Sequence, residues 1–239
     1  MLLGGVYNDP NMNTHDNLWK KVWSKNDLIN ISLIFLAGLI ASLMAVYFIN
    51  VELVYKVLLV ELGLVVSILG AVLWRLRVNK ISLSSIGIDE FRFRWIFLAI
   101  LLSLLVITIG GFLSSSLANF LGKEAGNLNT EDLLSDSLWL NVLYLKIFGA
   151  ILIPIVEELY FRGVLFRYFR QNNAFLKAAL WSSTIFALLH ISPVIMPFAF
   201  VLGFTSAWIY NKTNSLLPSF MLHIAVNSFA INLLFLSTI

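Results

Sequence analysis

The sequence contains no cysteine and few charged residues for its length. Only 12% of its 239 residues are charged, whereas 59% are hydrophobic. Since a soluble domain has about 25% charged residues, this chain has too few ionic groups to coat a globule, which excludes an ordinary soluble enzyme or a disordered protein. Without cysteine it has no disulfides, thiol nucleophile or Cys-ligated metal. The composition predicts an all-α fold, a polytopic transmembrane helical bundle within the lipid bilayer.

Seven apolar runs recur along the chain, each suited to crossing about 30 Å of hydrocarbon. Their approximate limits are 29–49, 53–74, 95–117, 138–170, 174–191, 194–210 and 216–237. The fourth run is too long for one straight span, so we expect about 7–8 membrane helices, with a kink near Gly149 and Pro154 or an interfacial first part. Residues 1–28 are predicted to form a polar N-terminal tail without a signal-peptide pattern. Residues 29–239 are predicted to form the transmembrane domain.

The placement of lysine and arginine predicts the orientation of the bundle. With the N-terminal tail in the cytoplasm, all of the 16 basic residues except Lys56, Lys123 and Lys146 fall on the cytoplasmic side, as the positive-inside rule requires. We therefore expect an integral membrane protein, in the plasma membrane, with a cytoplasmic N-terminus. The net charge is +3, and the charged residues fall between apolar runs. A membrane explains them better than a nucleic acid, so no nucleic-acid partner is expected. Segment 81–95 is predicted to be a cytoplasmic connector lying on the membrane surface.

Ionisable side chains inside apolar runs are costly and are functional candidates by default. The candidates are Glu157, Glu158 and Arg162 in PIVEELYFR, His190 at the end of FALLH, and His223 with Asn227 in MLHIAVN. Two further charged residues, Glu61 and Lys146, lie toward the outer halves of their runs, and we assign them no catalytic role.

Helical spacing separates the two adjacent glutamates. Glu158 and Arg162 are four residues apart on one helix face, so the arginine should hold Glu158 in its ionised form. Glu157 is rotated by about 100° from Glu158 and is the freer of the two to meet substrate or water. His223 and Asn227 have the same four-residue spacing, which places an imidazole beside a carboxamide.

Counting along the helices predicts that these groups meet. Glu157 lies about 15 residues before the polar turn at 171–173, and His190 lies about 17 residues after it. At about 1.5 Å per residue, both lie roughly 20–25 Å from the tip of this hairpin. The seventh run would bring His223 and Asn227 near the same depth. We therefore expect three helices to share one cavity within the membrane.

A carboxylate and an imidazole around one water can deprotonate it for attack on a carbonyl. A neighbouring histidine and asparagine can donate hydrogen bonds to the resulting oxyanion. Span serines such as Ser182 and Ser183 lack an evident base, so a serine triad is not indicated. A catalytic Zn²⁺ site with Glu157, His190 and His223 as ligands is the alternative. Because the H-E-x-x-H motif is absent, the metal-free site, which requires no cofactor, is slightly favoured.

Three motifs together resemble a known family. EELYFR (157–162), FALLH (186–190) and HIAVN (223–227) are similar, in this order, to the EExxxR, FxxxH and HxxxN/D motifs of the CPBP intramembrane peptidases, also called the Abi or CaaX-protease family. The resemblance covers about residues 138–232, predicted to be the peptidase core. It implies that Glu157 activates the water with help from His190, and that His223 and Asn227 form the oxyanion hole. It makes Glu158 and Arg162 supporting residues.

The expected function is an intramembrane endopeptidase of the CPBP type, with metal dependence left open. It would hydrolyse a peptide bond of a membrane-associated protein or peptide, in CaaX-type processing or in bacteriocin or leader-peptide processing. The family also includes proteins linked to bacteriocin self-immunity, so a non-hydrolytic immunity or membrane scaffold protein is the alternative. A proton- or ion-coupled transporter is a third possibility, which the absence of visible inverted repeats weakens.

Overall fold

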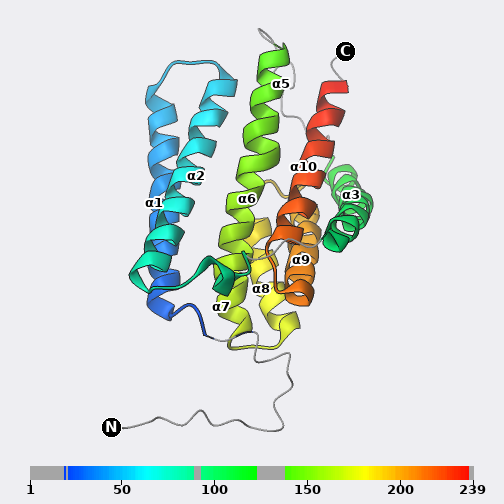
Figure 1. Ribbon diagram of the computed structural model, residues 1–239. Coiled ribbons are helices and arrows are strands. Elements are labelled where there is room, and N and C mark those ends of the chain that lie inside the picture. The colour runs from blue at the N-terminus through cyan, green and yellow to red at the C-terminus, as the bar shows by residue number, and fades with distance from the viewer. Residues whose placement is uncertain (1–18, 20, 89–92, 123–137, 237–239) are drawn as a thin grey trace, which may run out of the picture.

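The computed structural model describes residues 19, 21–88, 93–122 and 138–236, and all regular structure in these ranges is helical (Figure 1). The helices are α1 (Lys25–Phe48), α2 (Leu53–Val78), α3 (Arg94–Phe120), α5 (Leu138–Ile147), α6 (Ile153–Glu158), α7 (Arg167–Arg170), α8 (Phe175–Leu188), α9 (Met196–Thr213) and α10 (Leu217–Leu236). Two π-helical segments, η3 (Phe148–Leu152) and η4 (Leu159–Phe166), join α5, α6 and α7, and a short 3₁₀ helix, η2 (Leu83–Ile86), follows α2. Each predicted apolar run coincides with one helix or with the α5–α7 rod, which confirms the all-α class.

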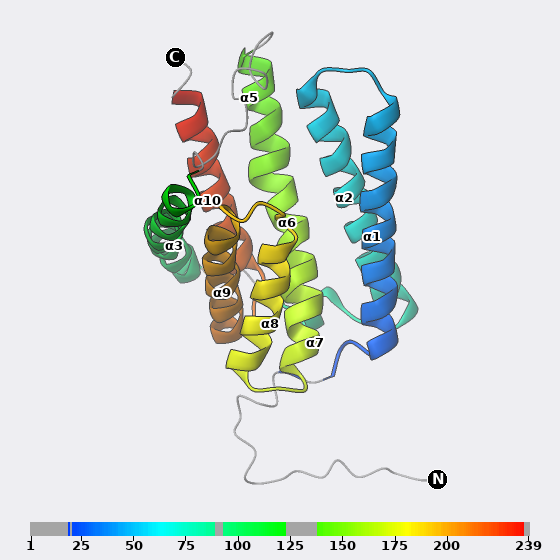
Figure 2. The ribbon, with the colours of Figure 1, turned by 180° about the vertical axis from the view of Figure 1, so that it is seen from behind.

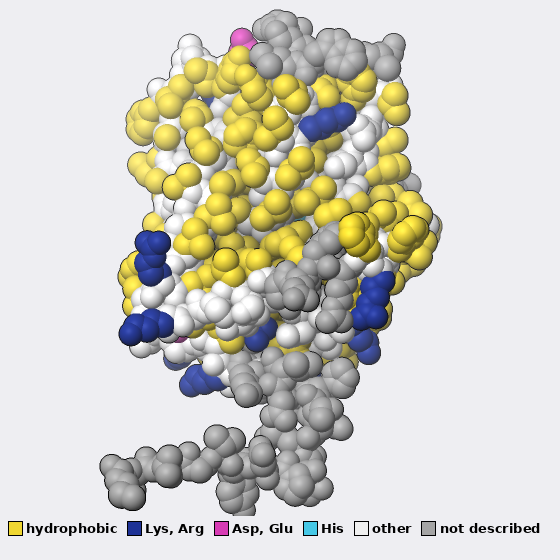
Figure 3. Space-filling view, viewed as in Figure 1, with side chains coloured by type: hydrophobic (Ala, Val, Ile, Leu, Met, Phe, Trp, Pro, Cys, Tyr) yellow, Lys and Arg dark blue, Asp and Glu magenta, His cyan; other side chains and the backbone are white. Residues whose placement is uncertain are grey.

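The surface of the bundle is the apolar surface of a membrane protein. Within the described ranges, Lys25–Phe48, Tyr55–Val78 and Arg94–Phe120 are long and apolar enough to cross a membrane, and Phe175–Leu188 and Leu217–Leu233 are shorter apolar helices. Large apolar side chains such as Met44, Phe97 and Phe112 are exposed on α1 and α3, and apolar atoms cover much of the face in Figure 3. In water this surface would be unfavourable, whereas lipid solvates it.

The fourth predicted run is one continuous helical rod, and the π-helical segment η3 lies where a kink was predicted. The N–H of Ile153 bonds to the carbonyl of Phe148, five residues earlier. In this register the carbonyl of Gly149 would need the N–H of Pro154, which proline lacks. The carbonyl of Gly149 is therefore left without a helical partner, in the middle of the bundle.

The rod stands between two groups of helices. The α1–α2 hairpin lies on one side of it, and α8, α9 and α10 lie on the other, with α3 packed against α9 and α10 (Figures 1 and 2). Close approach of α8 to α9 depends on Gly203, where an added Cβ would lie 3.2 Å from Phe186 and from Ser183. The rod consequently contacts both groups, and its side chains can reach groups on either side.

The described part of the predicted N-terminal tail packs into the bundle. Trp23 is fully buried, and its indole N–H donates to the carbonyl of Gly163 at 2.7 Å. Helix α1 begins at Lys25 with Ser24 as its N-cap, and Asp27 forms an ion pair with Arg75 of α2. Residues 1–18 lie outside the described residues, so the tail that they were predicted to form stays a prediction.

The connector between α2 and α3 is partly buried, and the prediction of a surface-lying segment is wrong for its centre. Ile86 has no exposed surface, and its carbonyl accepts a hydrogen bond from the hydroxyl of Tyr210. Gly87 adopts a φ of +86°, and its carbonyl accepts a 2.8 Å hydrogen bond from the N–H of Leu216. An added Cβ at Gly87 would lie 2.8 Å from the carbonyl oxygen of Asn214, so backbone packing sets this position. Residues 89–92 lie outside the described residues.

Candidate active site

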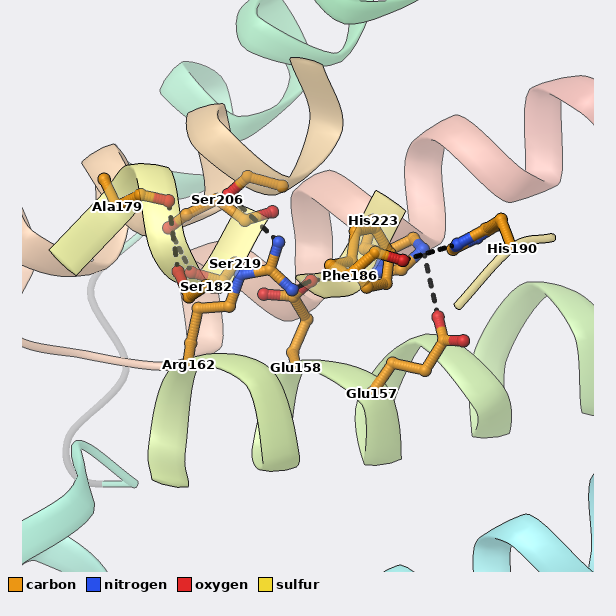
Figure 4. Close-up of polar contacts among 11 residues, drawn as sticks. Glu157, Glu158, Arg162, Ala179, Ser182, Phe186, His190, Ser206, Ser219 and His223 are labelled. Atoms are coloured by element: carbon orange, nitrogen blue, oxygen red, sulfur yellow. Dashed lines mark hydrogen bonds and ion pairs between the residues drawn. The ribbon is translucent and has the colours of Figure 1, made fainter. Parts of the chain in front are cut away.

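The candidate residues come from three helical elements that meet behind the α1–α2 hairpin. Glu157 and Glu158 end α6, Arg162 lies in η4, His190 follows α8, and His223 lies on α10. The side chains point toward one another in Figure 4. Of the four residues predicted to share one cavity, Glu157, His190 and His223 come together, with the Glu158–Arg162 pair beside them, whereas Asn227 bonds to Gly149 farther along the rod.

Glu158 and Arg162 form a buried ion pair, as their spacing predicted. Nη1 of Arg162 lies 2.9 Å from Oε1 of Glu158, and the two side chains are 1% and 0% exposed. Nη2 of Arg162 donates to the carbonyl of Gly203 at 3.0 Å, and the guanidinium carbon lies 4.8 Å from the centre of the Phe186 ring. Because the arginine is held by a carboxylate, a carbonyl and an aromatic ring, it fixes the position of Glu158.

His223 lies between the two adjacent glutamates. Its Nδ1 lies 3.0 Å from Oε1 of Glu158, and its Nε2 lies 3.6 Å from Oε2 of Glu157. A carboxylate at Nδ1 can only accept a hydrogen bond, so Nδ1 carries a proton and the ring orientation is set. Nε2 consequently faces Glu157 at a distance just beyond a direct hydrogen bond.

His190 is oriented by its own helix. Its Nδ1 lies 2.9 Å from the carbonyl oxygen of Phe186, an acceptor, so Nδ1 carries the proton. The ring of Phe186 packs edge-on against both imidazoles, with centroid distances of 4.7 Å to His190 and 5.8 Å to His223. In the neutral ring the lone pair of His190 is therefore on Nε2, where it can accept a proton.

A cavity of about 150 Å³ adjoins these groups on the side of the α1–α2 hairpin. Apolar side chains from α1, α2, the rod and α8 form most of its wall, and its polar side chains are Glu157 and His190. The side chain of Glu157 is 21% exposed, whereas that of Glu158 is 0% exposed. Glu157 is thus more accessible to water or substrate than Glu158, as their helical positions predicted.

Asn227 contacts the rod at Gly149, about two turns before Glu157. Its Nδ2 donates to the carbonyl of Gly149 at 2.9 Å, the carbonyl that the π-helical register leaves without a partner. One amide N–H of Asn227 is thus used within the protein, and the second is available to another acceptor. A role of Asn227 in an oxyanion hole stays a prediction.

The residues proposed as metal ligands do not form a preformed metal site. Within the described ranges, no three His, Asp or Glu side chains are grouped closely enough to hold a metal ion. The Nδ1 of each histidine is directed at a protein acceptor, which leaves its Nε2 for another partner, as in metal-ligating histidines, and Nε2 of His223 lies 3.6 Å from Oε2 of Glu157. The metal-free site and the zinc site stay alternatives, and metal dependence stays a prediction.

The sequence reasoning did not place Glu61 near this site. A Cβ added to Gly149 would lie 3.7 Å from Oε1 of Glu61, and Glu61 interacts electrostatically with Glu157. A carboxylate in the middle of an apolar run was the available signal. Its proximity to Glu157 depends on how α2 packs against the rod, which spacing along the chain does not reveal.

Comparisons with known proteins agree with the resemblance found in the motifs. Residues 138–229 match a family model described as Type II CAAX prenyl endopeptidase Rce1-like. This range contains Glu157, His190, His223 and Asn227. The predicted resemblance to this family of membrane peptidases is therefore confirmed over these residues.

Two curated proteins are similar to part of the chain. The UPF0177 protein YxdF of Lactococcus lactis subsp. lactis (strain IL1403) is 35% identical over 92 residues, which cover 38% of this chain and 50% of that protein. The protein named "Putative membrane peptidase YdiL" of Bacillus subtilis (strain 168) is 31% identical over 85 residues, covering 36% of this chain and 35% of that protein. The matches thus span half or less of these relatives. No solved structure matches the chain.

Proposed function

We propose that this chain is an intramembrane endopeptidase that hydrolyses a peptide bond of a membrane-associated protein or peptide with a water activated by Glu157. The observation that carries the proposal is the position of the Glu157 carboxylate, which lines a cavity together with His190 and lies 3.6 Å from Nε2 of His223. The match of residues 138–229 to a prenyl endopeptidase family supports the same reaction class. The bilayer and a peptide held in it are the expected partners.

The first step is the deprotonation of water. A water bound in the cavity between Glu157 and Nε2 of His190 gives one proton to the Glu157 carboxylate, while its oxygen attacks the carbonyl carbon of the peptide bond. His190 helps to orient this water, since its Nδ1–H is fixed on the Phe186 carbonyl. The proton held by Glu157 then passes to the nitrogen of the leaving amine as the carbon–nitrogen bond breaks.

The second requirement is a donor for the oxyanion that forms on the carbonyl oxygen. When His223 is protonated, its Nε2–H can donate to this oxygen, and Glu158 at Nδ1 stabilises the imidazolium. Arg162 keeps Glu158 in place and ionised, which gives the pair a supporting role. The second N–H of Asn227 is the further candidate donor.

The substrate belongs to the class of peptides that enter the site from the membrane. CaaX-type processing is one candidate, which the description of the matched family supports, and processing of a bacteriocin or leader peptide is the other. Either substrate would place a peptide bond at the depth of Glu157 while the rest of the peptide stays at the membrane.

The test compares Glu157→Gln with Glu52→Gln, a matched change at an exposed position at the start of α2. Purified proteins in lipid nanodiscs are incubated with a library of quenched fluorescent peptides, and cleavage is measured by fluorescence and mass spectrometry. We expect Glu157→Gln to lower kcat by about 10²–10⁴-fold, the usual contribution of a general base, and Glu52→Gln to have no effect. Equal cleavage by Glu157→Gln and the wild type would reject Glu157 as the base. If a biological effect in cells persisted in Glu157→Gln, a non-hydrolytic immunity or scaffold role would be favoured.

A further inference from the structure

The cavity beside Glu157 has a mostly apolar wall, which favours an apolar ligand group. Phe35 of α1 and Leu64 and Ile68 of α2 form its wall opposite the rod. The volume of this cavity is about 150 Å³. A cavity of that size can hold a benzene-sized group. A side chain that enters it must therefore carry an apolar portion of about that size.

Glu61 lies one helical turn beyond this cavity along α2 and along the rod, two of the elements that enclose it. On α2 it precedes Leu64 by three residues, so both side chains lie on one face. On the rod its Oε1 lies near Gly149, which precedes the cavity residue Ile153 by four residues. The apolar cavity consequently has a carboxylate just beyond one end, as well as Glu157 in its wall.

Glu61 has a hydrogen-bonding capacity that the described residues do not use. Its Oε2 is buried and accepts no hydrogen bond from any residue that the structure describes. In the described ranges, no lysine or arginine forms an ion pair with Glu61 or Glu157, and Arg162 is already paired with Glu158. Glu157 faces Nε2 of His223 at 3.6 Å, whereas Oε2 of Glu61 has no such partner among the described residues, and the two carboxyl groups interact electrostatically. A buried anionic oxygen in an apolar bundle is costly unless a donor or a cation meets it.

We propose that the cavity and Glu61 form a substrate subsite for a basic side chain, lysine or arginine, of the peptide to be cleaved. Lysine and arginine combine an apolar stem with a cationic head. The stem lies against Leu64 and Ile68, and the head forms an ion pair with Glu61 that also offsets the repulsion between Glu61 and Glu157. The inference rests on the proposed endopeptidase function and adds that the substrate carries a basic residue near the scissile bond.

The test measures the binding of two fluorescent apolar peptides to the full chain in nanodiscs of zwitterionic lipid. One peptide carries a single central lysine, and the other carries norleucine, which keeps the four-carbon stem but lacks the amine. We expect the wild type and Glu52→Gln to bind the lysine peptide at least 10-fold more tightly than the norleucine peptide. Glu61→Gln is expected to bring this ratio below about 3. Leu64→Phe, which narrows the cavity without changing its charge, is expected to weaken the binding of both peptides alike.

Equal affinity of the wild type for the two peptides, or a lysine preference that survives in Glu61→Gln, would overturn the subsite. Cleavage of the same peptides is measured in parallel to separate the two proposals. Binding with a lysine preference but without cleavage would reject the endopeptidase and keep the subsite. Cleavage without a lysine preference would reject the subsite and keep the endopeptidase.

Discussion

Nδ1 of His223 lies 3.0 Å from Oε1 of Glu158, so the glutamate that was expected only to pair with arginine also holds an imidazole. The same carboxylate oxygen lies 2.9 Å from Nη1 of Arg162. A continuous chain of charge-assisted contacts thus runs from Arg162 through Glu158 to His223, and Nε2 of that histidine faces Glu157. This arrangement gives Glu158 a physical route to influence the chemistry without contacting the substrate.

The role of Glu158 predicts separable effects on stability and on rate. Glu158→Gln leaves Arg162 buried without a counter-charge, which should cost about 3–5 kcal/mol of unfolding free energy. The double variant Glu158→Gln with Arg162→Met removes both charges and should recover much of that loss, but kcat should stay low because His223 lacks its carboxylate. Thermal unfolding in nanodiscs and cleavage kinetics measure the two effects. Full activity of the stable double variant would show that the pair serves only the fold.

A substitution of Asn227 separates its effect on stability from its effect on catalysis. Asn227→Ala removes the bond to the Gly149 carbonyl, worth about 0.5–1.5 kcal/mol, and also the second N–H of the amide. If that N–H binds the oxyanion, kcat should fall by about 10²–10³-fold with little change in KM. The control is Asn211→Ala, which loses a 3.0 Å hydrogen bond from Arg170 at the end of α9. A drop in kcat no larger than that of the control would remove Asn227 from the oxyanion hole.

The proposed mechanism, in which Glu157 deprotonates the water, predicts that cleavage does not depend on a metal. Purified protein is expected to contain less than about 0.1 equivalent of zinc, and cleavage should be unchanged after prolonged dialysis against a chelator. Elemental analysis and the cleavage assay are done on the same sample. Stoichiometric zinc, with activity lost in chelator and restored by added Zn²⁺, would require Glu157, His190 and His223 to rearrange into a ligand set.

Trp23 tests whether the segment before α1 is part of the folded bundle. Trp23→Phe removes the indole N–H and leaves the Gly163 carbonyl without this donor, so we expect a loss of about 1–3 kcal/mol in stability. Trp181→Phe is the matched control, because that side chain is 54% exposed on the surface of α8. Chemical or thermal unfolding is compared for both variants. Equal stability of the two would place Trp23 outside the cooperative unit.

Much of the helical layout could be predicted because it depends on local patterns. Apolar runs of membrane length fold as helices, since the bilayer leaves no other way to satisfy the backbone. The ion pair of Glu158 with Arg162 follows from four-residue spacing, which survives the change from α6 to the π-helical η4. The burial of Ile86 and Gly87 was not predicted, because it depends on contacts with Tyr210 and Leu216 far along the chain.

By itself, the sequence determined that the chain is a helical membrane protein, which residues are candidates for its chemistry, and that these residues lie at similar depth. Composition and periodicity suffice for this because hydrophobicity and helix rise are local properties. Only the tertiary structure decided that His223 faces both glutamates, that Asn227 donates to Gly149, and that Glu61 lies near Glu157. These relations depend on how each helix is rotated about its axis when it packs against its neighbours, and side-chain packing across the whole bundle sets that rotation.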